Sequence, residues 1–200
     1  MNKRHFFDQL ADEWDRQEAP DISLRLARVA ELAELRAGQR VLDVGTGTGV
    51  LISHIQRFVG ERGLIVALDI SREMLRQAVT KAHGDNVRFI LADMHQAPIG
   101  NDIFDRVICN AVFPHFDDKR RALPEAWRVL RAGGLLIISQ PIGREAVHRL
   151  HSQYQQVAED RVPDASTMCA MLEGAGWTGV QVIDEPEFYL ARAYKRLFAG

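Results

Sequence analysis

Three glycines alternate with threonines directly after an apolar run, in the stretch RVLDVGTGTGV from Arg40 to Val50. A glycine-rich loop of this kind lets the main chain approach a nucleotide closely. Its glycine spacing is not the G-x-G-x-x-G of dinucleotide sites, because Val50 stands where a glycine would be needed. No lysine follows the loop, and no Arg or Lys lies between Arg40 and Arg57. The loop therefore predicts a nucleoside site that holds no pyrophosphate.

An aspartate stands at the end of each of three successive apolar runs, at Asp43, Asp69 and Asp93. A carboxylate beside the glycine loop repels phosphate and attracts a cationic ligand. Asp69 is placed to accept hydrogen bonds from ribose hydroxyls, and Asp93 from an adenine amino group, with Met94 against the ring. S-adenosylmethionine combines an adenosine, an α-amino group and a sulfonium, so we expect it as the cofactor.

Three histidines follow the fourth and fifth apolar runs and are candidates for acceptor chemistry. His115 lies in FPHF, whereas His148 and His151 are three residues apart and share one face of a predicted helix. An imidazole can act as a general base or orient an acceptor near neutral pH. We expect all three to face the methyl end of the cofactor as catalytic residues, with His151 the preferred one, and we expect no metal site.

Strand-like and helical patterns alternate along the chain, and this alternation must place those residues. Near-continuous apolar runs such as LIVALD and GLLIISQ are typical of parallel strands buried on both faces. No helix separates the last two runs, WTGVQVID and FYLARAYK, so they should pair antiparallel. We predict an α/β fold with a doubly wound, mostly parallel seven-stranded sheet, its last strand antiparallel and helices on both faces. Ligands of such sheets bind at the carboxyl ends of the strands.

The chain is expected to form a single domain over residues 1–200. Residues 1–37 are predicted to be N-terminal helices that act as a lid. Residues 141–163 follow the fifth apolar run and are the least typical segment, so we interpret them as an insertion on the acceptor side.

Local signals predict where several helices begin and end. Asp21, Ser71 and Asp164 are predicted to be N-caps. Pro124 is expected in the first turn of a helix, where a missing N–H group costs nothing, and Gly133–Gly134 is expected to close that helix.

Composition limits the partners. Hydrophobic residues make up 46% of the chain and charged residues 26%, and the net charge is −2 with both signs interspersed. This leaves no basic patch for nucleic acid or an anionic membrane surface. Cys109 and Cys169 both lie in apolar runs and are interpreted as buried free thiols. With no apolar signal core or membrane-spanning run, we expect a cytoplasmic protein with a small-molecule substrate, and a homodimer stays open.

In their order, these motifs resemble those of the class I (seven-stranded, Rossmann-like) S-adenosylmethionine-dependent methyltransferases. VLDVGTGTG is similar to the first motif of that family, and VALDIS, LADMHQAPI, FDRVICNAVFPHF and RVLRAGGLLIIS are similar to the later ones. The resemblance covers roughly residues 40–195. The N-terminal FFDQLADEW resembles the lid helix of the small-molecule branch related to quinone-biosynthesis methyltransferases, which implies that Phe7 and Trp14 close over the cofactor.

The resemblance implies methyl transfer to a small molecule and a set of cofactor-binding residues. These are Asp43, Gly45, Thr46, Gly47, Asp69, Ile70, Met74, Asp93, Met94 and Asn110. Methyltransferases of nucleobase or glutamine amino groups resemble one another in an Asn/Asp-Pro-Pro-Tyr segment, and this chain has NAVF there. Cys109 lies inside a strand rather than after a proline, so cysteine-dependent base methylation is unsupported as well.

The expected reaction is an in-line displacement at the sulfonium methyl group, in which alignment and desolvation provide much of the acceleration. Two alternatives stay open. An aminopropyl transferase on the same fold would need several acids for a polyamine, and a noncatalytic S-adenosylmethionine-binding or sensing protein would lack a closed acceptor pocket. An NAD-dependent oxidoreductase is disfavoured by the glycine spacing.

Overall fold

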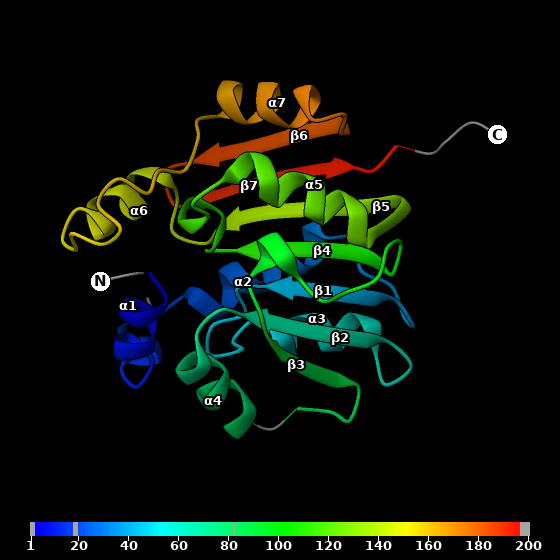
Figure 1. Cartoon of the computed structure of the whole chain (residues 1–200), viewed down its shortest axis with the longest axis horizontal. Helices are drawn as coiled ribbons and strands as arrows, with labels where there is room; N and C mark the ends of the chain where they lie inside the picture. The colour runs from blue at the N-terminus through cyan, green and yellow to red at the C-terminus, as the bar shows by residue number, and fades with distance from the viewer. Residues whose placement is uncertain (1–2, 18–19, 82, 197–200) are drawn as a thin grey trace.

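A seven-stranded sheet forms the centre of the protein (Figure 1), with strand order β3-β2-β1-β4-β5-β7-β6. The computed structural model describes residues 3–17, 20–81 and 83–196. In chain order the strands are β1 (Arg40–Val44), β2 (Leu64–Asp69), β3 (Val87–Leu91), β4 (Phe104–Asn110), β5 (Leu130–Gln140), β6 (Thr178–Glu185) and β7 (Phe188–Tyr194).

The sheet is parallel except at β7. Strands β3, β2, β1, β4 and β5 pair in parallel with their neighbours, whereas β7 runs antiparallel to both β5 and β6. The prediction of a mostly parallel seven-stranded sheet with a reversed last strand is therefore confirmed. Its physical basis is the short β6–β7 connection, which is too short for the crossover that a parallel pair needs.

Seven α-helices and three short 3₁₀ helices accompany the strands in the described part of the chain. The α-helices are α1 (Lys3–Leu10), α2 (Ile22–Leu32), α3 (Ile52–Val59), α4 (Arg72–Thr80), α5 (Lys119–Val129), α6 (Arg144–His151) and α7 (Ala165–Gly174), and the 3₁₀ helices are η1 (Trp14–Gln17), η2 (Met94–Gln96) and η3 (Phe113–His115). Within the described ranges no helix combines the length and apolarity needed to cross a membrane.

Two apolar layers hold the helices against the sheet. Consecutive strand residues point to opposite faces, so Leu42 packs with α5 and α7 whereas Val41 packs with α2 and α3. Buried Leu123 and Met168 represent the first helix layer, and Ile55 represents the second. Because both faces are covered, the strands contain near-continuous apolar runs, and polar side chains gather at the strand ends.

The carboxyl ends of the parallel strands all point to one edge of the sheet. Figure 1 shows α1 and α6 at this same edge, although they lie at distant points of the sequence. The N-terminal helices thus stand beside the residues that follow β1, β2 and β4, as a lid over the predicted ligand edge requires.

Helix termini match the sequence in part. Ser71 and Asp164 are N-caps, and their side chains accept hydrogen bonds from the N–H groups of Met74 and Thr167. Asp21 caps no N–H group, because its carboxylate instead pairs with Arg25.

The expected boundaries of α5 are wrong. The helix begins at Lys119, after the N-cap Asp118, so Pro124 lies inside it. It ends at Val129, and the segment around Gly133 already belongs to β5, where Gly133 has a φ of 73°. The capping side chain of Asp118 fixes the start of the helix earlier than the proline signal indicated.

Candidate active site

A first pocket opens at the carboxyl ends of β1, β2 and β4. Its wall contains nine of the ten predicted cofactor residues: Gly45, Thr46, Gly47, Asp69, Ile70, Met74, Asp93, Met94 and Asn110. These residues come from the glycine loop and from the segments that follow β2, β3 and β4. The parallel sheet is what brings them together, since its strands all end at this edge.

The glycine loop is folded tightly against its neighbours. The N–H groups of Gly45 and Thr46 donate to the carbonyl oxygen of Leu68, at 2.7 and 3.0 Å. Gly45 has a φ of 64°, and a Cβ atom there would lie 2.3 Å from Val112. Gly47 has a φ of 55° and faces open space. A side chain is therefore excluded at Gly45 by packing, whereas at Gly47 the bare main chain is presented to the pocket.

Asp69 ties the loop to the end of β2. Its two carboxylate oxygens accept from the N–H groups of Gly47 and Ser71, each at 2.8 Å. Burial raises the pKa of Asp69, while the N–H donors oppose the rise. Each carboxylate oxygen can accept more than one hydrogen bond. The side chain is therefore fixed in place and still has capacity for ligand hydroxyls.

Asp43 lies behind the glycine loop and is not part of the pocket wall, so its expected role in cofactor binding stays a prediction. It is 1% exposed, and its carboxylate accepts a 2.7 Å hydrogen bond from Thr46 Oγ1. Burial, with a further contribution from the charge of nearby Asp69, raises the pKa of Asp43 to about 7. Its contact with the pocket is indirect, through Thr46.

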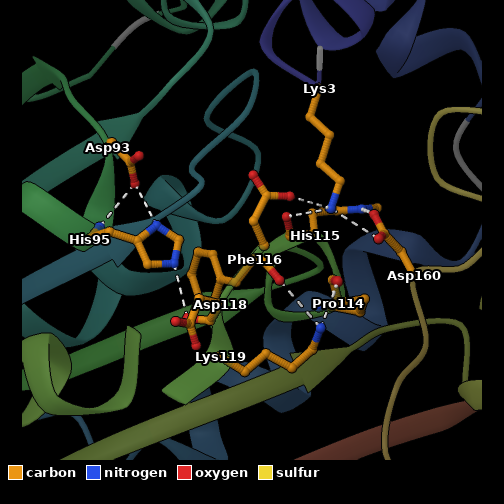
Figure 2. Close-up of polar contacts among 10 residues, drawn as sticks. Lys3, Asp93, His95, Pro114, His115, Phe116, Asp118, Lys119 and Asp160 are labelled. Carbon is orange, nitrogen blue, oxygen red and sulfur yellow. Dashed lines mark hydrogen bonds and ion pairs between the residues drawn. The ribbon is translucent and has the colours of Figure 1, made fainter. Parts of the chain in front are cut away.

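Asp93 is held by the residue two positions further on (Figure 2). Its Oδ1 accepts from both the N–H and Nδ1 of His95, at 2.9 and 2.7 Å. Burial opposes ionisation, but these two donors hold the pKa of Asp93 below its usual range. His95 Nε2 in turn lies 3.0 Å from the carbonyl oxygen of Asp118. This chain of contacts joins the β3 and β4 loops on one side of the pocket.

The N-terminal segment covers the pocket by attaching to two of its walls. Asp8 accepts a 2.6 Å hydrogen bond from Ser71 Oγ, and Asp15 accepts one of 2.5 Å from Thr48 Oγ1. Next to these attachments in the sequence, Phe7 and Trp14 contribute to the pocket wall, with ring centroids 6.0 Å apart. Both residues thus line the pocket, and their closure over a bound cofactor stays a prediction.

A second pocket adjoins the first and is formed by the N-terminal helices, β5 and the α6 segment. The two pockets have six residues in common: Phe7, Trp14, Val50, Asn110, Ala111 and His115. Asn110 accepts from Ser139 Oγ at 2.9 Å through its Oδ1, so its Nδ2 remains available at this boundary. Each pocket encloses roughly 1000 Å³, a volume that includes the open space at its mouth.

His115 lies at the boundary between the two pockets and is held by Asp160. Its Nδ1 is 2.8 Å from Asp160 Oδ2, and both side chains are close to nine-tenths buried. Lys3 completes the cluster, donating to Asp160 Oδ1 at 2.9 Å and to the carbonyl oxygen of His115 at 3.0 Å (Figure 2). The ammonium also pairs with exposed Asp117. Three distant segments therefore meet at one imidazole.

The two histidines of α6 have different surroundings. His151 is 7% exposed and lines the second pocket, with its ring centroid 4.7 Å from that of His115. His148 contacts Arg161 instead and lines neither pocket, so the expectation that it faces the acceptor is wrong. Three residues along a helix are rotated by about 60° from perfect alignment, and this offset is enough to direct His148 outward.

Several residues of the site carry no sequence signal of their own. Lys3 is the first residue of an amphipathic helix, Asp160 lies in a polar segment, and Gln140 ends an apolar strand. For Asp8 and Asp15, the only sequence signal was the high density of charged residues in the N-terminal stretch.

Cys109 is fully buried, which raises the pKa of its thiol and agrees with a packing role. No group of three or more potential metal ligands is found among the described residues.

Comparisons with known proteins agree with this geometry. A family model described as a methyltransferase domain matches residues 42–138. The ubiquinone/menaquinone biosynthesis C-methyltransferase UbiE of Vibrio cholerae is 31% identical over 71% of this chain and 65% of its own length. The same enzyme of Pectobacterium carotovorum is 30% identical over 75% of this chain and 70% of its own length. This chain thus spans about two thirds of the length of these relatives.

Solved structures share the fold. A SAM-dependent methyltransferase from Aquifex aeolicus superimposes with a TM-score of 0.75 at 22% identity, covering 98% of this chain and all of that one. Phosphoethanolamine N-methyltransferase 2 of Haemonchus contortus, in complex with S-adenosyl-L-methionine, gives a TM-score of 0.71 at 16% identity, over 86% of this chain and 52% of that one. The chain therefore belongs to the class I S-adenosylmethionine-dependent methyltransferases, among which it resembles the quinone-biosynthesis enzymes, and S-adenosylmethionine is its cofactor.

Proposed function

We propose that this enzyme transfers the sulfonium methyl group of S-adenosylmethionine to a small molecule bound in the second pocket, by in-line displacement. The observation that carries the proposal is the shared boundary of the two pockets. Asn110 and His115 line both, so a cofactor in one and an acceptor in the other would meet there. A methyl group has to pass directly between its two partners, and adjoining pockets provide that path.

The residues of the first pocket fit the cofactor. Asp69 has acceptor capacity for ribose hydroxyls, and Asp93 is ionised beside buried Met94, which suits an adenine ring. The bare main chain at Gly47 permits close approach. Lys3 is the one Lys or Arg in the described pocket wall, and its partners are Asp160, Asp117 and a carbonyl oxygen. Among the described residues, the pocket therefore offers no unpaired Lys or Arg for a pyrophosphate.

The sulfonium supplies an electrophilic methyl group when the cofactor is bound. The contribution of the protein is alignment and exclusion of water. Phe7 and Trp14 form a wall of both pockets and are proposed to cover the two ligands from the solvent side. His115 and His151 are proposed to face the acceptor, as their positions on the second pocket allow.

The wall of the second pocket also bears on the alternatives. An aminopropyl transferase would need carboxylates for a polyamine, and none of the described residues that line the second pocket is Asp or Glu. A protein that only senses the cofactor needs no such pocket. The relatives are C-methyltransferases of ubiquinone and menaquinone biosynthesis, so a precursor of that chemistry is one acceptor to assay.

The test begins with the cofactor. In titration calorimetry, S-adenosylhomocysteine should bind with one site per chain, and NAD should give no heat of binding. Methyl transfer is then measured as S-adenosylhomocysteine formed from S-adenosylmethionine in the presence of candidate acceptors. Binding of NAD without any response to S-adenosylhomocysteine would contradict the proposal at its first step. Cofactor binding without turnover on any acceptor would favour the sensing alternative.

A further inference from the structure

The second pocket has an apolar wall. It is formed largely by aliphatic and aromatic side chains, and among the described residues that line it there is no Asp, Glu, Lys or Arg. Placing an ion in such surroundings without an opposite charge costs several kcal/mol or more. A charged acceptor would therefore lose more hydration than the wall returns, whereas an uncharged, mainly apolar molecule would gain from burial.

One polar group of this wall lacks a hydrogen-bond partner. Gln140, at the end of β5, lines the second pocket and is only 3% exposed. Its Nε2 is buried and makes no hydrogen bond to any described residue. That nitrogen is covered by protein atoms, so a ligand oxygen would reach it only after the side chain turns. Asn110, His115 and His151 also belong to this wall, so it favours a ligand with a polar substituent on an apolar body.

The pairing of His115 with Asp160 determines where the imidazole carries its proton. A carboxylate can only accept, so Nδ1 of His115 donates to Asp160 Oδ2 over their 2.8 Å contact. In the neutral ring, Nε2 then carries a lone pair. Burial opposes the charge of Asp160, but hydrogen bonds from His115 and Lys3 hold its pKa below the usual range. An ionised carboxylate therefore supports the imidazole from behind.

His151 is less suited than His115 to accept a proton from the acceptor. Its Nδ1 donates to the carbonyl oxygen of Asp160, at 2.7 Å, so no carboxylate contacts its ring. Burial lowers the pKa of His151, and the neighbouring His115 lowers it further. Of the two adjacent rings, His115 is the one whose protonated form has a direct counter-ion.

We infer that the second pocket takes an uncharged, mainly apolar acceptor bearing an acidic O–H group, and that the Asp160–His115 pair accepts its proton. The inference rests on the proposed function. Nε2 of His115 takes the hydroxyl proton while the oxygen forms a bond to the methyl carbon. The carbon–sulfur bond breaks, and its electron pair remains on sulfur, which becomes neutral. Asp160 balances the charge of the imidazolium, which later releases its proton to solvent. His115 is thus a catalytic residue and Asp160 a positioning residue.

The first experiment measures the acceptor class by binding. The protein is saturated with S-adenosylhomocysteine and titrated with 2-naphthol, naphthalene-2-sulfonate and 2-methylnaphthalene, which share one ring system. We expect 2-naphthol to bind about tenfold more tightly than either of the others. Equal or tighter binding of the sulfonate, or no binding of 2-naphthol to the wild-type protein, would overturn the acceptor class.

The second experiment measures the positioning role without turnover. Nitrogen-15 NMR of the histidine rings should show neutral His115 protonated at Nδ1 in the wild-type protein. Asp160→Asn should shift this tautomer toward Nε2, and Asp160→Glu should restore it. Asp117→Asn is the matched control, because it removes the other carboxylate on Lys3 and leaves the His115 contact intact. An unchanged tautomer in Asp160→Asn would overturn the role of the pair.

Methyl transfer to 2-naphthol completes the test. Asp160→Asn should lower kcat about tenfold or more and leave KM for 2-naphthol within about twofold, because the lost interaction acts on the reacting proton rather than on binding. An unchanged kcat, or no transfer by the wild-type protein, would count against the inference. S-adenosylhomocysteine binding is measured on every variant. If the wild-type protein does not bind S-adenosylhomocysteine, the proposed function itself is contradicted. If it binds normally but the other results fail, only this inference is contradicted.

Discussion

Asp69 accepts two main-chain hydrogen bonds and still faces the cofactor pocket, so one side chain serves the loop and the ligand. We expect Asp69→Ala to weaken binding of S-adenosylhomocysteine by about 2–3 kcal/mol, roughly 30- to 150-fold, because charge-assisted hydrogen bonds to ribose are lost. Calorimetry gives the dissociation constant, and circular dichroism checks the fold.

The matched control for Asp69 is Asp85→Ala, an exposed carboxylate before β3 that lines neither pocket. Its dissociation constant should equal that of the wild-type protein. If Asp69→Ala also binds normally while remaining folded, Asp69 does not hold the cofactor.

Asp43 gives the stability of the protein a specific pH dependence. Its pKa rises from 3.8 to about 7 on folding, so between these values the folded chain binds more protons than the unfolded chain. Its contribution to stability is greatest below pH 3.8 and is lost as the pH rises to about 7. The slope reaches about 1.4 kcal/mol per pH unit at most. Asp43→Asn removes this titration and can still accept from Thr46.

Urea unfolding without cofactor, at pH 5 and pH 8, measures this effect. The free energy of unfolding of Asp43→Asn relative to the wild-type protein should be higher at pH 8 than at pH 5. Asp85→Asn should show no such change. The same difference at both pH values would mean that Asp43 does not titrate in this range.

At the scale of elements, α5 contains a proline in its interior. Pro124 is exposed and follows the helix start at Lys119 by more than one turn, so its ring removes a hydrogen bond to the carbonyl oxygen of Arg120. Pro124→Ala should raise the free energy of unfolding by about 1–2 kcal/mol, after allowing for the greater freedom of the unfolded chain.

Urea unfolding compares Pro124→Ala with Arg120→Ala, an exposed substitution on the same helix. The control should change the free energy of unfolding by less than about 0.5 kcal/mol. A destabilised Pro124→Ala would show that the helix start depends on the ring of the proline, beyond the capping by Asp118.

Elements were predictable where the local pattern and the tertiary environment agree. The buried runs of β2 and β5 have no competing interpretation, and the missing helix before β7 determines the direction of that strand. The glycine loop and Asp69 were found because they are local signals at strand ends. The α5 start was missed since Pro124 was taken as a boundary signal, although Asp118 supplies the stronger N-cap.

The acceptor side was less predictable because it depends on contacts between distant segments. Lys3, His115 and Asp160 are separated by 112 and 45 positions, as their hydrogen bonds record. No spacing rule relates such residues. The sequence indicated that an imidazole at His115 or His151 could serve the acceptor, and it contained no information on the carboxylate behind it.

At the scale of the whole molecule, the N-terminal segment is attached to the glycine loop and to α4 by short side-chain contacts. Trypsin cleavage after exposed Arg16 requires this segment to open. We expect saturating S-adenosylhomocysteine to slow cleavage after Arg16 more than cleavage after Arg62, which lies in a distant turn. Mass spectrometry of timed digests measures both. Equal slowing at the two sites would indicate that the ligand stabilises the whole protein and has no added effect on the N-terminal segment.

Phe7 and Trp14 belong to the walls of both pockets, and this has a thermodynamic consequence. A ligand in either pocket would restrict the same two side chains, so the second ligand to bind would find their conformational entropy already lost. Linkage requires the effect to be reciprocal: the factor by which S-adenosylhomocysteine tightens 2-naphthol must equal the factor by which 2-naphthol tightens S-adenosylhomocysteine. The shared aromatic wall thus makes cofactor and acceptor cooperative ligands of one another, even where they do not touch.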